Sequence, residues 1–285
     1  GGPQGMVGIE RVVDEIAHFL GKDPIEVRRA NFYDPKGAIK DRAVTPYGMT
    51  VEDCIIDEIV AELRDSADYD KRRADIREWN QTSQTLKRGI ALTPVKFGIS
   101  FTLTFLNQAG ALVHVYNDGS IHLNHGGTEM GQGLFTKVAQ VAARSFQVDI
   151  DRIKITATHT GKVPNTSATA ASSGSDLNGM ATADACAKIK KRLHDFAVER
   201  WQTSPDEVAF FPGGVRIGSD TVSFDELISQ AYQARIPLSA TGFYATPKIN
   251  WDKVQAKGRP FFYFAYGAAV TEVAIDTLTG ENRML

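Results

Sequence analysis

The nine residues from His125 to Gly133 combine glycines with polar side chains in a pattern that could bind a ligand. They read His-Gly-Gly-Thr-Glu-Met-Gly-Gln-Gly and include four glycines. Glycine has no Cβ, so backbone N–H groups can approach a ligand here, and the N-terminus of the predicted helix that follows favours negative charge. The segment suits a phosphate or a pterin, although it is neither a Rossmann nor a Walker loop. A glycine-rich turn without a ligand fits the residues at least as well.

A second segment of small residues, from Pro164 to Ser175, leads into a long predicted helix that begins at Asp176. Hydroxyl groups and the unpaired N–H groups of a first helical turn can bind a phosphate without any Lys or Arg. Taken alone, the segment is better explained as a solvent loop that ends in N-cap serines. Taken together, the two loops could frame one extended anionic cofactor.

The elements that precede these loops are predicted to form a helical block over residues 1–82. Apolar residues recur at helical spacing. Asp23 is predicted to cap one helix in a capping-box arrangement with Glu26, and Thr50 is predicted to cap another. Helices are therefore expected over residues 6–20, 24–31, 51–63 and 69–79.

After the polar residues 80–88 the periodicity changes, and residues 83–285 are predicted to form an α/β domain. Asn117-Asp118-Gly119 predicts a hairpin turn. The fold class is a mixed α/β arrangement with helices laid on a sheet. Strands or extended segments are expected over residues 89–92, 97–105, 111–116, 120–123, 153–158, 238–246 and 261–275, with helices over 134–146, 176–201 and 224–234.

Composition excludes several classes of protein. Formal net charge is −2 and the basic residues are dispersed, so a nucleic-acid partner is not expected. No window is apolar enough for a membrane span. The only cysteines, Cys54 and Cys186, each fall on a predicted helix, which favours reduced thiols in a cytoplasmic protein. His125 and Glu129 have no further ligand at metal-binding spacing, so both are predicted to be structural and no metal-ligating residue is assigned.

Many separate segments resemble the xanthine dehydrogenase family of molybdenum hydroxylases. They are spread along the whole chain, which makes accidental agreement improbable. They are residues 1–4, 97–102 (Phe-Gly-Ile-Ser-Phe-Thr), 105–111 (Phe-Leu-Asn-Gln-Ala-Gly-Ala), 125–133, 163–167, 169–172, 176–179, 240–244, and Gly267 with Glu272-Val273.

The resemblance implies a molybdenum-cofactor-binding domain and gives roles to individual residues. Cofactor contacts are implied for Met130, Gly131, Gln132, Ala171, Ser172 and Gln233. The family pattern has a second Ser where this chain has Gly174, which leaves the position of the phosphate-binding hydroxyl open. Substrate contacts are implied for Phe101, Thr102 and Leu106; without the resemblance, Phe101 and Leu106 would be assigned to the core of an apolar strand.

The family hydroxylates hypoxanthine and xanthine to urate at molybdenum-molybdopterin and passes electrons through 2Fe-2S clusters and FAD to NAD. The resemblance thus implies a purine substrate, an iron–sulfur/FAD subunit or domain, and a homodimer. The family's catalytic base would lie beyond Leu285, so no catalytic residue is assigned and the chain alone is expected to be an inactive fragment. Two other functions stay open: an aldehyde oxidase-like hydroxylase, and a non-enzymatic module that binds a phosphate ligand.

Overall fold

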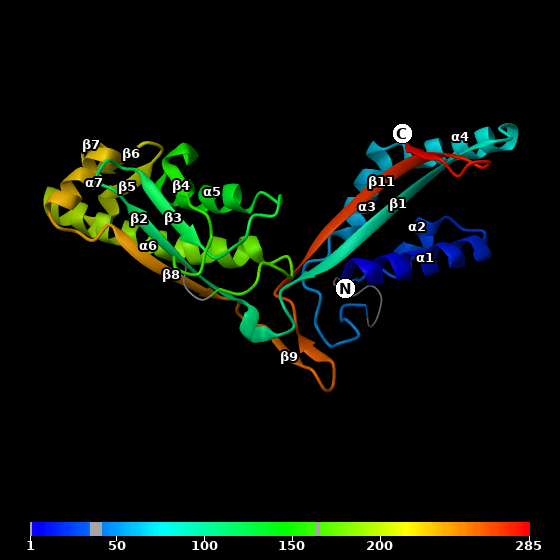
Figure 1. Cartoon of the computed structure of the whole chain (residues 1–285), viewed down its shortest axis with the longest axis horizontal. Coiled ribbons are helices and arrows are strands. Elements are labelled where there is room, and N and C mark those ends of the chain that lie inside the picture. Colours follow the sequence, from blue (N-terminus) through cyan, green and yellow to red (C-terminus); the bar gives the residue numbers. More distant parts are fainter. Residues whose placement is uncertain (1, 35–41, 163–165) are drawn as a thin grey trace. The chain divides into compact units, whose positions relative to one another are not determined.

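The computed structural model describes residues 2–34, 42–162 and 166–285 (Figure 1). The chain divides into two compact units. Unit 1 comprises residues 1–98, 252–259 and 263–285, and unit 2 comprises residues 99–251 and 260–262. The first boundary of these units, at residues 98 and 99, differs from the predicted one at 82 and 83, so the division into a helical block and an α/β domain stays a prediction.

Four helices belong to unit 1: α1 (Gly2–Leu20), α2 (Pro24–Arg29), α3 (Ile56–Ser66) and α4 (Tyr69–Thr82). Asp23 caps α2 as predicted, because its carboxylate accepts the N–H of Ile25 at 3.0 Å. The Glu26 carboxylate, expected in a capping box, instead accepts a hydrogen bond from Arg64 at 3.0 Å.

The predicted start of the third helix is wrong. Helix α3 begins at Ile56 rather than Val51, and Thr50 is not its cap. Thr50 pairs with Val44 in an antiparallel bridge, and the N–H of Val51 donates to Ala43 at 2.8 Å. These bridge hydrogen bonds compete with a helical turn, so Cys54 lies before α3 rather than in it.

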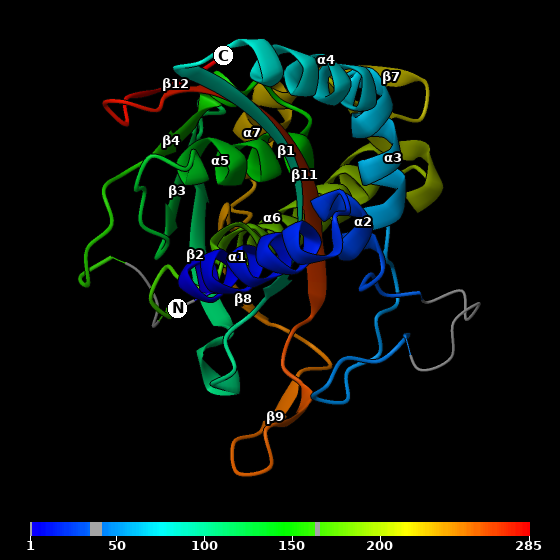
Figure 2. The ribbon, with the colours of Figure 1, turned by 90° about the vertical axis from the view of Figure 1, so that its right-hand side faces the viewer.

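The sheet of unit 1 has the order β1-β11-β12, with β1 at Leu86–Ile99, β11 at Tyr263–Asp276 and β12 at Asn282–Met284. Figure 2 shows β1 and β11 as two long curved strands side by side. The two strands expected near residues 89–92 and 97–105 are thus one strand that ends at Ile99. Buried residues of the helices and β1 form the core: Ile25, Val60, Tyr69, Ile76, Ile90 and Leu92.

Unit 2 is built on a four-stranded sheet with the order β4-β3-β2-β8. Strand β2 is antiparallel to both β3 and β8, whereas β3 is parallel to β4. Helix α6 packs on β2 and β8, and a Cβ at Gly242 of β8 would overlap the carbonyl oxygen of Ala181. The strands are β2 (Gln108–Val115), β3 (Ile121–His125), β4 (Ile153–Ile155) and β8 (Ser239–Ala245), and the helices are α5 (Leu134–Phe146) and α6 (Gly174–Trp201).

A smaller sheet in unit 2, of order β5-β6-β7, escaped the sequence analysis. Each of its strands has four residues, which is too short for a clear alternation: β5 (Val208–Phe211), β6 (Gly214–Ile217) and β7 (Asp220–Ser223). Helix α7 (Phe224–Gln233) follows with Ser223 as its N-cap. The remaining short elements are β9 (Asn250–Asp252), β10 (Lys257–Arg259) and the 3-10 turns η1 (Thr104–Leu106), η2 (Ile150–Arg152) and η3 (Pro205–Glu207).

The mixed helix and sheet class is confirmed. Cys54 and Cys186 are both free thiols. Among the helices that the structure describes, none is both long enough and apolar enough to cross a bilayer.

Candidate cofactor pocket

The glycine-rich loop joins β3 to α5 and begins at a buried histidine. His125 is 2% exposed, and its Nδ1 accepts the N–H of Gly127 at 3.1 Å. Burial lowers the pKa of His125 to about 4, so the ring is neutral near pH 7. A Cβ at Gly127 would lie 2.6 Å from Leu134 Cδ2 and 2.7 Å from Asn178 Nδ2, which restricts this position to glycine. His125 therefore supports the loop, as predicted.

The carboxylate of Glu129 occupies the N–H groups at the start of α5. Its Oε1 accepts from Gly131 at 2.9 Å and from Gly133 at 3.0 Å, while Oε2 accepts from Phe135 at 3.0 Å. These backbone hydrogen bonds, that from Phe135 first, lower the pKa of Glu129. The structural role predicted for Glu129 is confirmed, but the expectation that the loop offers these N–H groups to a ligand is wrong.

The side chain of Gln132 also binds within its own loop. Oε1 accepts the N–H of Met130 at 2.6 Å, and Nε2 donates to the carbonyl oxygen of Thr128 at 2.9 Å. A primary amide has a second N–H and a second lone pair, so Gln132 can still bind a ligand without breaking either contact. Met130 is 66% exposed, which leaves its apolar side chain available to a ring system.

The second loop is tied to the first and ends in an unusual turn. Thr169 Oγ1 accepts the N–H of Thr128 at 2.8 Å. Ala171 and Ser172 have φ values of 55° and 57°, a left-handed conformation that costs free energy for residues other than glycine. The turn closes with the N–H of Ser173 on the carbonyl of Ala170 at 3.3 Å.

Helix α6 starts directly after this turn. Its N-cap residue is Ser173, yet the Ser173 hydroxyl donates to Ala170 at 3.1 Å and makes no capping hydrogen bond to the helix. The prediction that serines cap this helix through their side chains is therefore wrong for Ser173. Because N–H groups of a first turn have no intrahelical acceptor, the positive end of the α6 dipole faces this loop.

The two loops enclose one cavity of about 480 Å³, within the usual size range for small-molecule sites. Four of the predicted cofactor residues line it, and Gly131 lies in the loop between two of them. Lys137 also lines the cavity, so a cation stands beside the hydroxyl groups that the sequence indicated. The lining residues are Met130, Gln132, Leu134, Lys137, Thr169, Ala170, Ala171, Ser172, Gly174 and Ser175.

These residues fit a pterin that carries a phosphate. The Ser172 hydroxyl, the Lys137 ammonium group and the start of α6 supply donors and positive charge to the cavity. Gln132 and Met130 supply an amide and an apolar surface to the same cavity. The only carboxylate in the first loop, Glu129, is directed to backbone N–H groups rather than to this cavity.

Gln233 is not brought to this cavity. It is the last residue of α7, and its neighbour Tyr232 lines a different pocket beside His114 and Tyr116. The glycine-rich loop starts at His125, which pairs with Ala111 of β2, whereas His114 lies three residues farther along that strand. The cofactor contact implied for Gln233 stays a prediction that its position does not support.

The residues assigned to substrate lie in the segment that joins β1 to β2. Phe101 and Leu106 were expected in a strand, but the strand ends at Ile99; Phe101 follows it in a loop and Leu106 ends the turn η1. Phe101 and Leu106 are half-buried and Thr102 is exposed. The loop prevents the burial that an apolar strand would give, so these side chains are not core residues.

Asn107 is a residue of this segment that sequence reasoning missed. It is only 2% exposed, and its side chain forms three hydrogen bonds with the backbone of Phe101 and Thr104. A polar residue directly after an apolar run, in the quoted Phe-Leu-Asn-Gln segment, was the available signal.

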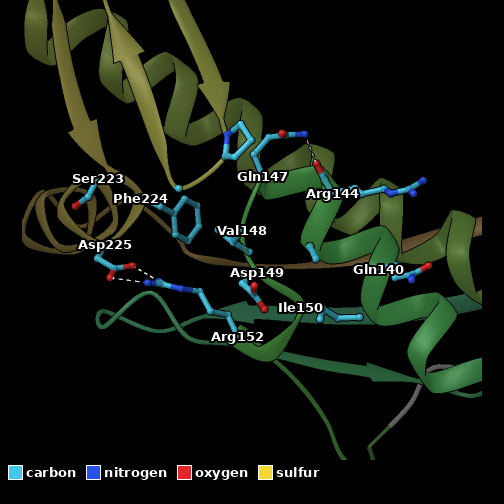
Figure 3. A pocket seen from close by; sticks show the side chains of 13 residues that line it. Gln140, Arg144, Gln147, Val148, Asp149, Ile150, Arg152, Ser223, Phe224 and Asp225 are labelled. Carbon is cyan, nitrogen blue, oxygen red and sulfur yellow. Dashed lines mark hydrogen bonds and ion pairs between the residues drawn. The ribbon is translucent and has the colours of Figure 1, made fainter.

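A larger cavity of about 700 Å³ lies at the other end of α5 and contains none of the predicted site residues (Figure 3). Arg152 and Asp225 form an ion pair across it, with the Nη2–Oδ2 distance at 2.9 Å. Across residues 2–34, 42–162 and 166–285, no group of three His, Cys, Asp or Glu side chains could hold a metal ion.

Comparisons with known proteins show the family to which the chain is related. A family model described as a molybdopterin cofactor-binding domain matches residues 62–285, and a second model with the same description matches residues 1–32. Xanthine dehydrogenase of Oryza sativa subsp. japonica is 44% identical over 281 residues, which are 99% of this chain and 19% of that protein. Xanthine dehydrogenase/oxidase of Mus musculus is 43% identical over 285 residues, 100% of this chain and 20% of that protein.

Solved structures show the same fold at lower identity. The Cu,Mo-CO dehydrogenase aligns with a TM-score of 0.78 at 20% identity, over 97% of this chain and 35% of that one. Quinoline 2-oxidoreductase from Pseudomonas putida 86 aligns with a TM-score of 0.76 at 20% identity, over 96% of this chain and 35% of that one. This chain thus spans about a fifth of the length of the xanthine dehydrogenases it matches, and it belongs to the molybdopterin cofactor-binding domain family.

Proposed function

We propose that this chain is a molybdopterin-binding part of a xanthine dehydrogenase, and that the cavity between the two loops holds the cofactor. The observation that carries the proposal is the convergence of Met130, Gln132, Ala171 and Ser172 on one cavity of about 480 Å³. The family resemblance implies a cofactor contact for each of these four residues. Relatives 43–44% identical across the chain are named xanthine dehydrogenases.

Different residues of this chain are proposed to contact the phosphate and the pterin. Ser172, Lys137 and the first turn of α6 hold the phosphate, and Gln132 orients the pterin through its remaining N–H and lone pair. Ala171 keeps one wall small. When bound, molybdenum-molybdopterin would supply the redox chemistry of purine hydroxylation, and the protein contributes placement and electrostatics.

Phe101, Thr102 and Leu106 are proposed to contact the substrate. A half-buried phenyl ring can stack on a flat heteroaromatic substrate, and the exposed Thr102 hydroxyl can donate to or accept from a purine edge. Electron transfer through iron–sulfur clusters and FAD to NAD, and a homodimer, are part of the proposal for the whole protein. A cytoplasmic location is proposed as well, and it is supported by two cysteines that are both free thiols.

The test uses the intact protein that contains this chain, together with its redox partner. Molybdenum content and xanthine-dependent NAD reduction are measured for the wild type and for Gln132→Ala. Bound molybdenum with xanthine oxidation, and loss of either in the variant, supports the proposal. Bound molybdenum with activity only on aldehydes or other heterocycles would give an aldehyde oxidase-like hydroxylase instead. Absence of molybdenum, with binding of another phosphate ligand, would give a non-enzymatic binding module.

A further inference from the structure

The loop that carries Phe101 starts from a backbone conformation that must be held in place. Ser100 has a φ of 147°, in the region that favours glycine, and it is 5% exposed. A residue other than glycine keeps such a conformation only when its surroundings impose it. Neighbouring groups must therefore supply the free energy that fixes this loop.

Asn107 supplies much of that constraint. Its Oδ1 accepts the N–H of Phe101 at 2.7 Å, and its Nδ2 donates to the carbonyl of Phe101 at 2.9 Å and to that of Thr104 at 3.1 Å. The amide thus pairs with both backbone groups of Phe101, as a residue of a neighbouring strand would. Fixing both groups fixes the direction of the Cα–Cβ bond of Phe101, and so limits its ring to the few positions that the χ1 rotamers allow.

The constraint is itself anchored in unit 2. The carbonyl of Asn107 accepts the N–H of Thr246 at 2.9 Å, and the N–H of Asn107 donates to Thr104 at 3.1 Å. On the other side of the loop, the N–H of Phe262 donates to Ile99 at 3.1 Å and to Ser100 Oγ at 3.3 Å. Asn107 therefore links Phe101 to the end of β8 in the four-stranded sheet.

We propose that Asn107 is a positioning residue that sets the ring of Phe101 for a flat aromatic substrate. This inference rests on the proposed function, and it adds a determinant of substrate class in a side chain that does not itself touch the substrate. Asparagine is suited to this place because one side chain must both accept and donate. An aspartate of the same shape would keep the acceptor but would direct a carboxylate at two carbonyl oxygens.

The experiment compares Asn107→Asp and Asn107→Ser with the wild type in the intact protein. Molybdenum content, kcat and KM are measured with xanthine and with a small aliphatic aldehyde, which has no ring to stack on Phe101. We expect unchanged molybdenum content and a fall in kcat/KM for xanthine of about tenfold in Asn107→Asp, mostly through KM, since misplaced binding groups commonly cost that much or more. For the aldehyde we expect a change of less than about twofold, because that substrate does not use the ring.

Asn80 provides a matched control in unit 1. Its side chain also pairs with both backbone groups of one residue: Nδ2 donates to Arg88 O and Oδ1 accepts from Arg88 N, both at 2.8 Å. Asn80→Asp should lower stability without changing the ratio of xanthine to aldehyde kcat/KM. A double-mutant cycle with Phe101→Ala adds a second readout, because Asn107→Asp should have little further effect on xanthine once the ring is gone.

Each outcome decides the inference. Equal losses for xanthine and aldehyde, additive effects with Phe101→Ala, or loss of molybdenum in both Asn107 variants would show that Asn107 serves folding alone. If the wild type holds molybdenum but does not oxidise xanthine, the proposed function fails and the inference fails with it. Wild-type xanthine activity with an unchanged Asn107→Asp overturns the inference alone.

Discussion

The two loops of the candidate pocket have similar compositions but different hydrogen-bonding arrangements. Each joins the sheet to a helix and is rich in small residues. The first closes on itself, because the Glu129 carboxylate accepts hydrogen bonds from Gly131, Gly133 and Phe135. The second has no acidic side chain among its described residues 166–173, although Asp176 lies in the first turn of α6, and it reaches that helix through the left-handed pair Ala171 and Ser172.

The difference shows that a glycine-rich loop and a serine-rich loop can make different contacts to one ligand. A helix N-terminus attracts anions only while its N–H groups are available. In α5 they serve an internal carboxylate, which orders the loop and places Met130 and Gln132 at the cavity. Among its described residues 166–173 the second loop brings no carboxylate to α6, although Asp176 lies within the first turn of that helix. We therefore place the proposed phosphate beside Ser172 and Lys137, which line the cavity, whereas Asp176 does not.

The largest loss of cofactor is expected when a carboxylate like that of Glu129 is introduced into the second loop. In Ser172→Glu a carboxylate would enter the phosphate side of the cavity, where two like charges about 4 Å apart repel by about 4 kcal/mol at an effective dielectric constant near 20. The molybdenum and pterin content of the purified intact protein should fall at least about tenfold. The same change at Ser219, exposed in the turn between β6 and β7, is the control. Full cofactor content in Ser172→Glu would contradict the proposed orientation.

The second prediction concerns the buried histidine below the first loop. The pKa of His125 is lowered from 6.5 to about 4 in the folded protein, so the unfolded state binds the proton more readily. Stability is therefore lost as the pH falls from 6.5 towards 4, by about 2 kcal/mol at pH 5. Urea unfolding at pH 7 and pH 5 should show this loss in the wild type and a smaller one in His125→Gln.

Exposed His159, outside this loop, provides the control for that titration. His159→Gln should keep the loss of stability seen in the wild type. Equal pH dependence in the wild type and in His125→Gln would show that the ring is not a buried neutral group.

The sequence predicted these regions well where the stabilising contacts join residues close together in the chain, and poorly where they join different segments. Helix α5 was predicted at its observed bounds, residues 134–146, because its apolar spacing is regular and glycines precede it. The Asp23 cap was predicted because it acts two residues along the chain. Thr50 has the same local signature, but pairing with Val44 overrides it, and that pairing is invisible in a helix-capping pattern.

The pocket was predicted in its parts and not in its assembly. Both loops were identified from their residues, whereas Lys137 was missed because only the fold brings the first turn of α5 to Ser172. Glu129 could have been assigned as a cap, since acidic residues before a helix stabilise its N-terminus. The place of Phe101 depends on Asn107 and Phe262, whose contacts cross from one segment to another and have no periodic signal.

A smaller effect is expected for the one cation of the cavity. Lys137 is exposed, so its attraction for a phosphate is screened and should contribute no more than about 1 kcal/mol. In Lys137→Gln the cofactor should be retained up to about fivefold less well during dialysis at low ionic strength, and the difference should shrink at high salt. Lys191→Gln, on the exposed face of α6, is the control. An unchanged rate of loss would remove Lys137 from the phosphate site.

The smallest effect is expected for the carboxylate of the first loop. Glu129→Gln keeps the shape but removes the charge, so the thermal midpoint at pH 7 should fall slightly. Because the pKa of Glu129 is lowered below its usual value of 4.5, its contribution is present above pH 4.5 and is lost as the pH falls through the lowered pKa. The difference between variant and wild type should therefore vanish at acidic pH. A constant difference would show that the charge is not what stabilises the loop.

The central claim is that a phosphate of the cofactor lies between the second loop and Lys137, away from Glu129. A crystal structure of the intact protein with its cofactor would test it most directly. The account predicts phosphate density within hydrogen-bond distance of Ser172 and the first turn of α6, with the hydrogen bonds of Glu129 to its own loop unchanged. Phosphate density on the N–H groups of the glycine-rich loop, with Glu129 displaced, or a cofactor bound outside this cavity, would contradict the account.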